Sequence, residues 1–302
     1  MTDLALGVVA GGTASEIAAR EALPVQSIWA GGHVASPNGS PEAMVGLARL
    51  ASLTDRVRIG TSILLLPLYP PAIVAKQIAD LDRATTGRVT LGVGIGGEYP
   101  VEFRACQSPR SERGARTDEA ISLLRKLWSG EPVTHRGRYY SMEDVLILPA
   151  PVQAGGPPIV VAGRREPAMR RAARLGDGWM PYLYSARRYA SSVETVSALA
   201  REAGRDLTNF EWYAFVFVAV NRDGERAREH ATRFLGGMYN QDFPAMLPSI
   251  AAVGTPEEVT CSLQAFVDAG ARHLIMAPAT ADRDGTLARL FDDVIPELHV
   301  RA

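Results

Sequence analysis

The sequence has few cysteines, almost no lysine and no long apolar run. Its two cysteines, Cys106 and Cys261, are far apart and form no Cys-x-x-Cys pair, which argues against a disulfide framework and against a cysteine zinc site. The 32 basic residues, all but two of them arginine, stand against 33 acidic ones. The resulting net charge of −1 lacks the basic excess that a sequence-independent nucleic-acid binder needs.

Two kinds of targeting or membrane segment are also missing. The longest uncharged stretch, residues 59–75, is interrupted by three prolines and is short for a membrane span. The N-terminal residues carry no basic segment of the kind that opens a signal peptide. Because 47% of the residues are hydrophobic, the chain has enough apolar surface to fold. The sequence therefore predicts a folded cytoplasmic protein that binds neither nucleic acid nor a membrane.

Eight short apolar runs are typical of β-strands, and several are apolar on both faces, as strands of a buried parallel sheet are. They span residues 4–10, 27–30, 58–66, 89–95, 159–162, 178–182, 212–220 and 273–277. Helical patterns lie between them and after them, at residues 41–52, 71–85, 111–129, 167–175, 189–203, 223–234, 256–269 and 286–295.

Strands that alternate with helices predict βα units. Eight such strands in about 300 residues predict a TIM (β/α)8 barrel, formed as one domain by residues 1–302. One departure from regularity is the Pro/Gly-rich segment 131–158, between the fourth helix of the barrel and the fifth strand. We expect it to form a short, hairpin-like excursion over a barrel end.

One motif suggests a different fold. Residues 92–97 read GVGIGG, a literal G-x-G-x-x-G after a strand. A dinucleotide-binding fingerprint needs a helix that opens at once and a carboxylate that ends the next strand about 20 residues later. Here Pro100 and Phe103 follow, and the predicted helix begins near Ser111. The glycines are better explained as positions where a flat ligand approaches the strand end closely.

Polar residues at the C-terminal ends of the strands are the candidates for a barrel active site. His33 follows two glycines after the second strand, where the alternative is a structural histidine. Thr61 and Ser62 lie in the third strand, where two small hydroxyls could equally face a neighbouring strand. Glu98 and Glu102 follow the fourth strand, although most such glutamates are solvated loop residues.

The end of the fifth strand offers a candidate phosphate site. Gly163 and Arg164 run directly into a helix that has Pro167 near its start. The first N–H groups of a helix are unpaired and its N-terminus carries partial positive charge, so an anion can bind there. The alternative is a plain helix start with solvated arginines. Before the sixth strand, Asp177 could simply fix a glycine-rich turn.

Three stretches together resemble the luciferase-like monooxygenase family, at residues 59–103, 113–128 and 157–181. The first contains GTSILLLPLYPP and GVGIGGEYPVEF, the second reads RGARTDEAISLLRKLW, and the third contains IVVAGRREP and GDGWMP. The resemblance covers residues 4–277. This family comprises flavin-dependent monooxygenases and oxidoreductases that use the 5-deazaflavin coenzyme F-420. Its fold is a TIM barrel, which agrees with the strand count.

The resemblance implies three catalytic residues and one unusual peptide bond. His33 would lie beside the reactive face of the cofactor ring, although Gly32 replaces the acidic neighbour that many members have. Glu98 is the nearest match to an acid that donates a proton in some deazaflavin members, and Glu102 fits the Glu-Phe pair common in the family. A non-proline cis peptide, costly and retained only for function, is expected between Ser62 and Ile63, behind the ring.

The resemblance also implies which residues bind the cofactor. They come from the third, fourth, fifth and sixth strands, and the fifth-strand group would hold the phosphate. They are Thr61, Ser62, Ile63, Gly94, Gly96, Ala162, Gly163, Arg164, Gly178, Trp179 and Met180. No metal site is expected.

The function that the resemblance implies is hydride transfer between coenzyme F-420 and a small or medium organic substrate, with His33 moving a proton. One alternative is a monooxygenase that uses reduced FMN and oxygen, and another is a cofactor-binding barrel without turnover. The arginine-rich composition, typical of a GC-rich genome, favours the deazaflavin. Family members are often dimers, so the resemblance allows for a homodimer. Aromatic residues near the strand ends predict an apolar mouth: Trp29, Tyr69, Tyr99, Phe103, Tyr182 and Tyr184.

Overall fold

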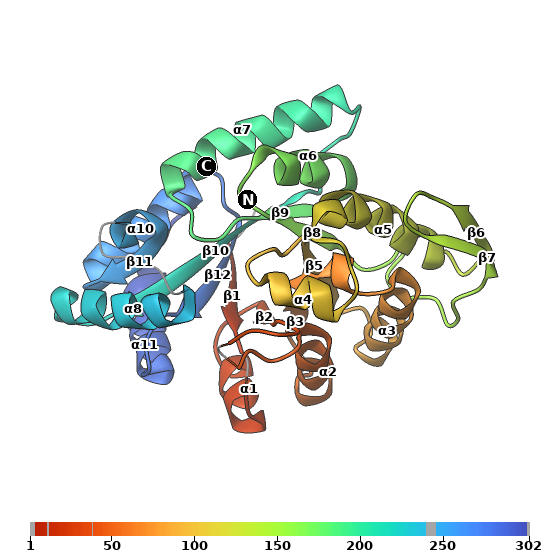
Figure 1. Cartoon of the computed structure of the whole chain (residues 1–302). Coiled ribbons are helices and arrows are strands. Elements are labelled where there is room, and N and C mark those ends of the chain that lie inside the picture. The colour runs from red at the N-terminus through yellow and green to blue at the C-terminus, as the bar shows by residue number, and fades with distance from the viewer. Residues whose placement is uncertain (1–3, 11, 38, 240–245, 301–302) are drawn as a thin grey trace.

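The computed structural model describes residues 4–10, 12–37, 39–239 and 246–300. Within them, eight parallel strands close into a barrel that helices surround (Figure 1). Each strand pairs with the next around the barrel, and the last pairs with the first. The strands are β1 (Ala5–Val9), β2 (Ser27–Ala30), β3 (Arg58–Thr61), β5 (Val89–Gly94), β8 (Ile159–Ala162), β9 (Gly178–Met180), β10 (Glu211–Val220) and β12 (His273–Pro278). The predicted TIM (β/α)8 barrel is confirmed, and the eight predicted strands form it.

Two strands depart from the prediction. The predicted strand 58–66 is split into β3 and β4 (Leu64–Leu65), and β4 pairs with β5. A further strand, β11 (Ala251–Gly254), lies outside the predicted strands and pairs with the end of β10. Its four residues are too few to show the alternation that separates a strand from a helix.

Helices form the outer ring of the barrel, and none in the described ranges is long and apolar enough to cross a bilayer. Each predicted helix is present with shifted ends, and the last continues into a π-helical turn, Leu290–Val294. The sequence analysis does not predict three short helices, α1 (Ala14–Glu21), α4 (Pro100–Ala105) and α9 (Leu247–Ile250), because they are too short to show a periodic apolar face. The helices are α1 (Ala14–Glu21), α2 (Ala43–Leu53), α3 (Pro71–Ala84), α4 (Pro100–Ala105), α5 (Arg113–Leu127), α6 (Glu166–Leu175), α7 (Ala186–Glu202), α8 (Gly224–Tyr239), α9 (Leu247–Ile250), α10 (Pro256–Asp268) and α11 (Arg283–Arg289).

The segment between α5 and β8 forms the antiparallel hairpin β6 (Val133–Arg136) and β7 (Ser141–Val145). The hairpin projects from the side of the barrel next to α5, not over a barrel end as the sequence suggests (Figure 1). The Glu119 carboxylate of α5 explains this position, because it accepts hydrogen bonds from the backbone N–H groups of Tyr139 and Tyr140, at 3.1 and 2.9 Å. These bonds fix the hairpin turn to the flank of α5.

The N-terminal end of the barrel interior holds a buried polar network, called the floor network below. The indole N–H of Trp29 donates to Ser27 Oγ at 2.7 Å. Ser27 therefore has its own hydrogen available for His273 Nε2, also at 2.7 Å. Burial, helped by the charge of Arg58, lowers the pKa of His273 to about 3, so this ring is neutral at physiological pH.

The rest of the floor network extends from His273 across the barrel. The ring of Tyr213 stacks on His273 with centroids 4.6 Å apart, and its hydroxyl is hydrogen-bonded to Glu211. The Arg58 guanidinium binds Glu211 at 3.0 Å and the Thr90 hydroxyl at 2.8 Å. Apolar side chains cover this network on the side of the C-terminal strand ends, namely Val160, Ala162, Met180 and Ile275.

Candidate active site

The C-terminal ends of β2 and β5 bring His33 and Glu102 together. His33 lies in the loop after β2 and Glu102 in α4, and His33 Nδ1 is 3.2 and 3.3 Å from the two carboxylate oxygens. The Glu102 carboxylate is fully buried and also accepts the backbone N–H of Val34 at 2.8 Å. Because Glu102 engages Nδ1, Nε2 is the nitrogen left for a reacting group. Glu102 thus orients the imidazole, as the carboxylate of an acid–base pair does.

Two glycines place the His33 loop. A side chain on Gly31 would collide with the carbonyl oxygen of Ser62, and one on Gly32 would collide with the carbonyl oxygen of Pro41. The backbone N–H of His33 donates to that Pro41 carbonyl at 3.0 Å. The glycines that precede His33 in the sequence therefore serve a close approach of three backbone segments.

The loop after β5 adds an aromatic ring and a second carboxylate to the site. Tyr99 meets His33 edge-on, with ring centroids 4.9 Å apart, and its hydroxyl donates to the Met238 carbonyl of α8 at 3.4 Å. Glu98 reaches solvent, but partial burial raises the pKa of its carboxyl, and the nearby Glu102 charge adds to the rise. The charges of His33 and Arg164 oppose that rise. All three predicted catalytic residues therefore lie together.

The predicted cis peptide between Ser62 and Ile63 is present at the end of β3. Ser62 Oγ is buried and has no hydrogen-bond partner among the described residues. Thr61, in contrast, is fully buried and donates its hydroxyl to the Gly92 carbonyl at 2.7 Å, so it joins two strands. Of the two hydroxyls named from the sequence, Ser62 is the one whose oxygen is available to a ligand.

The glycines at the end of β5 and just after it each have a structural reason. A side chain on Gly94 would overlap the Cδ1 atom of Ile63, so glycine here makes room for that side chain. Gly96 and Gly97 have φ values of +61° and +119°, which favour glycine. They turn the chain out of the barrel toward α4. No dinucleotide-binding helix follows, since α4 has only six residues.

The predicted phosphate loop joins β8 to α6. Gly163 has a φ of +147°, and a side chain there would overlap Ala168. The carbonyl of Arg164 accepts the Arg188 guanidinium at 3.0 Å. The Arg164 guanidinium lies 4.9 Å from the ring centroid of Tyr182, and its charge reaches Glu98. Arg164 therefore faces the same space as the predicted catalytic residues.

The three predicted residues of β9 face in different directions. Met180 lies in the barrel interior, whereas Trp179 is fully buried against Tyr184 and Tyr189 on the outer side. The indole N–H of Trp179 donates to the Gly163 carbonyl at 3.0 Å. Its side chain thus supports the phosphate loop from behind, and the expectation of a direct cofactor contact fits Met180 better. A side chain on Gly178 would press on the Glu211 carbonyl, so this glycine permits close strand packing.

The aromatic mouth is smaller than the sequence predicts. Trp29 belongs to the floor network, and Phe103 and Tyr184 are buried. Tyr69 donates its hydroxyl to Glu42 at 2.6 Å and lines a different cavity. Tyr99 and Tyr182 present their rings to the His33 and Arg164 side chains of the mouth. The buried Tyr184 reaches this region only through its hydroxyl, which donates to the Arg164 carbonyl at 3.4 Å. Proximity to a strand end in the sequence does not reveal on which side of the strand a ring lies.

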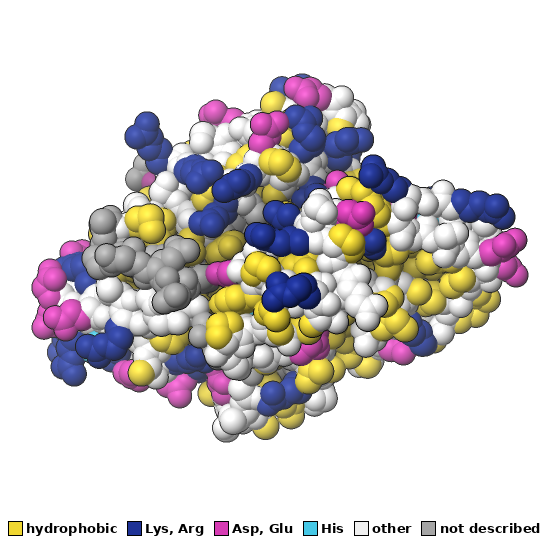
Figure 2. Space-filling model, in the orientation of Figure 1, with side chains coloured by type: hydrophobic (Ala, Val, Ile, Leu, Met, Phe, Trp, Pro, Cys, Tyr) yellow, Lys and Arg dark blue, Asp and Glu magenta, His cyan; other side chains and the backbone are white. Residues whose placement is uncertain are grey.

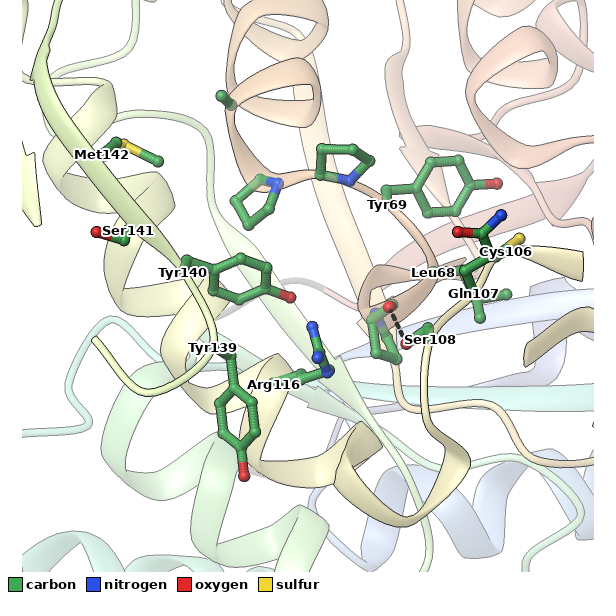
Figure 3. A pocket seen from close by; sticks show the side chains of 14 residues that line it. Leu68, Tyr69, Cys106, Gln107, Ser108, Arg116, Tyr139, Tyr140, Ser141 and Met142 are labelled. Atoms are coloured by element: carbon green, nitrogen blue, oxygen red, sulfur yellow. Dashed lines mark hydrogen bonds between the residues drawn. The ribbon is translucent and has the colours of Figure 1, made fainter. Parts of the chain in front are cut away.

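A cavity of about 380 Å³ lies outside the mouth, between the start of α3 and the hairpin (Figure 3). The side chains of Tyr140, Arg116 and Met142 lie on one side of it, and Tyr69, Cys106 and Gln107 on the other (Figure 3). Leu68 lines this cavity and packs against Leu65 and Phe103. Within the described part of the chain, its lining residues do not include His33, Glu98 or Glu102.

Two arginines that the sequence analysis does not single out also reach the mouth. Arg110 donates to the Gly97 carbonyl at 2.9 Å, and Arg113 lies against the same glycine. They stand at the start of a long amphipathic helix, where arginines are common on the surface. Only the fold shows that this helix start meets the loop after β5.

The parallel barrel, with acid–base, hydroxyl and cationic groups at the C-terminal ends of its strands, defines a TIM-barrel enzyme with a cofactor-type site. The family model described as luciferase-like monooxygenase matches residues 13–245. The chain belongs to the luciferase-like monooxygenase family.

The similarity to individual known proteins covers most of this chain and most of each of them. An F-420-dependent glucose-6-phosphate dehydrogenase of Beutenbergia cavernae is 31% identical over 295 residues, which cover 90% of this chain and 85% of the relative. The structure of an F-420-dependent secondary alcohol dehydrogenase in complex with an F-420–acetone adduct is similar with a TM-score of 0.84 at 22% identity, over 98% and 99% of the two chains. The oxygenating constituent of 3,6-diketocamphane monooxygenase from Pseudomonas putida, in complex with FMN, has a TM-score of 0.79 at 19% identity, again over 98% and 99%.

Proposed function

We propose that this chain is an oxidoreductase that transfers a hydride between coenzyme F-420 and a small or medium organic substrate. The observation that carries the proposal is the His33–Glu102 pair, which shares the mouth with Arg164, because the charges of His33 and Arg164 both act on Glu98. The full-length relative that uses F-420 supports the choice of coenzyme. A sugar phosphate and a secondary alcohol are the substrates in the names of the similar proteins, and either kind fits the proposed class.

The residues of the mouth fit such a coenzyme. The buried, unpartnered Ser62 Oγ is an orphaned polar atom beside the strand end where the ring would lie. Gly163, Arg164 and the first turn of α6 would hold the phosphate, because unpaired N–H groups and a guanidinium both favour an anion. Bound there, the coenzyme would supply a ring carbon that accepts or donates a hydride, and the protein would supply orientation and proton transfer.

We propose the following proton steps for the residues of the mouth. In the oxidation of an alcohol, its carbon would give a hydride to the bound coenzyme while His33 Nε2 would accept the hydroxyl proton. In the reduction of a carbonyl, the same nitrogen returns a proton to the oxygen. The buried Glu102 carboxylate stabilises the imidazolium between these steps, and it fixes the ring through Nδ1. The raised pKa of Glu98 makes its carboxyl the second candidate for a proton donor.

The direct test is a titration of the apo-protein with F-420 and with FMN, each oxidised and reduced, followed by fluorescence. We expect F-420 to bind with a dissociation constant in the low micromolar range or below. Tighter binding of FMN than of F-420 would favour the alternative, a monooxygenase that uses reduced FMN and oxygen. If the protein retains F-420 but turns over no hydride donor or acceptor, the result would support the other alternative, a cofactor-binding barrel without catalytic activity.

We also propose that residues 1–302 act as one barrel domain, in the cytoplasm and as a homodimer. The two unpaired cysteines fit a reducing compartment. Sedimentation of the purified chain tests the dimer, and a monomer at micromolar concentration would contradict it.

A further inference from the structure

The pairing of β5 with β8 places two loops side by side at the mouth. Val93 pairs with Val161, which brings the chain after Gly94 next to the chain after Ala162. The first loop contains Gly96 and Gly97, and the second is the predicted phosphate loop. Burial raises the pKa of Glu98 in the first loop, and the charge of Arg164 in the second loop opposes that rise, so the two loops remain close beyond the strands.

Arg110 and Arg113 bring two more cations to this place. The Arg110 guanidinium donates to the Gly97 carbonyl at 2.9 Å, and Arg113 Nε is 3.2 Å from the point where a Cβ on Gly97 would lie. Arg113 also donates to the Arg110 carbonyl at 2.8 Å. Its Nε atom is buried and has no hydrogen-bond partner among the described residues. A buried N–H of a guanidinium without an acceptor is uncommon and calls for a ligand or another explanation.

The charges around these loops do not balance. Arg110, Arg113, Arg164 and Arg165, called the rim arginines below, carry four positive charges. Glu98 is the carboxylate that faces Arg164, and the nearby Glu102 is bound to His33.

The neighbouring acids are engaged elsewhere: Glu112 pairs with Arg116 at 2.9 Å, and Glu166 pairs with Arg170 at 2.8 Å. In the space-filling view, Lys and Arg side chains gather at the centre of this face (Figure 2). Such an excess of one sign attracts a multiply charged anion.

We infer that the rim arginines bind the anionic extension of the coenzyme, the chain of carboxylates that continues beyond its phosphate. This inference rests on the proposed function, because it assumes that F-420 occupies the mouth. The helix start and Arg164 are enough to bind one phosphate, and Arg110 and Arg113 contact Gly97 in the adjoining loop. FMN ends at its phosphate, so the rim arginines would favour F-420 over FMN.

The test compares the dissociation constants of three ligands in the wild type and in a double variant of the rim arginines. Apo-protein is titrated by fluorescence with F-420, with the same coenzyme lacking its glutamates, and with FMN. In the wild type we expect the glutamate-bearing form to bind about 10-fold more tightly than the form without glutamates, with a steeper loss of affinity in salt. In Arg110→Gln/Arg113→Gln this preference should fall to about 2-fold or less, because two partly exposed charge contacts are removed.

A matched control removes two arginines far from the rim. Arg136→Gln/Arg201→Gln changes the net charge equally, since both side chains are exposed and neither lies at the mouth. It should leave all three dissociation constants unchanged. A rim variant that loses affinity equally for the forms with and without glutamates would show that these arginines only hold the Gly97 loop, and the inference would be wrong. Equal binding of both forms by the wild type would also refute it.

Two further outcomes separate this inference from the proposed function. Failure of the wild type to bind any form of F-420 would overturn the proposed function and this inference with it, whereas binding without a glutamate preference overturns this inference alone. Loss of fold in the double variant, seen as a lower thermal midpoint, moves the test to Arg165→Gln. The Arg165 side chain is exposed at the first turn of α6, so its removal should reduce the same preference without affecting the fold.

Discussion

The two ends of the barrel interior use polar residues in opposite ways. At the floor, Ser27, Arg58 and His273 each find a protein partner at hydrogen-bond distance. At the mouth, Ser62 Oγ and Arg113 Nε are buried without one, and these are two of the five such side-chain atoms in the described part of the chain. Buried polar groups are normally paired. The floor network is therefore satisfied by the protein itself, whereas two polar atoms at the mouth remain available to a ligand.

His33 gives the largest expected effect and tests the mouth. His33→Ala should lower turnover by about 10²–10⁴-fold, the usual contribution of a general acid–base group. Cofactor affinity and thermal midpoint should change little, because the side chain is partly exposed. Steady-state rates of the Ala and Asn variants at saturating coenzyme and substrate, across pH, provide the measurement. If both keep more than about a tenth of wild-type turnover, the proton moves elsewhere, and Glu98 is the next candidate.

His273 tests the floor through its effect on stability. The unfolded ring has a pKa near 6.5 and the folded ring one of about 3, so the unfolded state binds more protons at acid pH. Stability is therefore complete above pH 6.5 and falls as the pH decreases toward 3. Between pH 7 and 5 this loss should be about 2 kcal/mol in the free energy of unfolding.

Urea unfolding of the wild type and of His273→Asn at both pH values measures this contribution. The variant should be less stable at pH 7, because Ser27 loses its acceptor, and it should lack most of the pH dependence. Its turnover per folded molecule should stay close to wild type. A pH dependence equal to that of the wild type would mean that another group titrates.

Arg164 should affect binding and not folding. Arg164→Ala should raise the dissociation constant of the coenzyme about 10-fold, the loss of one charged contact to a phosphate. Its guanidinium stacks on Tyr182 at the open mouth, so the thermal midpoint of the apo-protein should hardly change. Fluorescence titration and thermal unfolding on the same preparations separate the two effects. A drop in the apo midpoint as large as the loss of affinity would assign Arg164 to the fold.

Glu98 should give the smallest change. Partial burial raises the pKa of its carboxyl, so it holds its proton to higher pH than an ordinary glutamate. Glu98→Gln should remove this ionisation from the pH profile of kcat/KM and change the maximum by no more than a few-fold, since His33 carries the main proton step. A pH profile identical to that of the wild type would show that Glu98 takes no part in the reaction.

The sequence predicts the barrel well because its strands are buried on both faces and read as continuous apolar runs. It also predicts that His33, Glu98 and Glu102 lie at the same end of the barrel, since all three follow the C-terminal ends of strands. The sequence analysis fails where the role of a residue depends on the direction in which its side chain points. Trp179 and Met180 are adjacent in the sequence, yet one supports the outer layer and the other lines the interior. It also misses Arg110 and Arg113, which reach the mouth through a contact with Gly97 that no local pattern encodes.

The contact between Gly94 and Ile63 has a consequence for how this protein can change over evolution. The Ile63 side chain occupies the space that any residue larger than glycine at position 94 would need. The two positions are therefore coupled in one direction: a larger residue at position 94 is tolerated only after the residue at position 63 has become smaller. Among relatives, an alanine or serine at the position of Gly94 should occur together with a residue smaller than isoleucine at the position of Ile63. Such covariation would keep the combined volume of the two side chains nearly constant while the shape of the mouth changes.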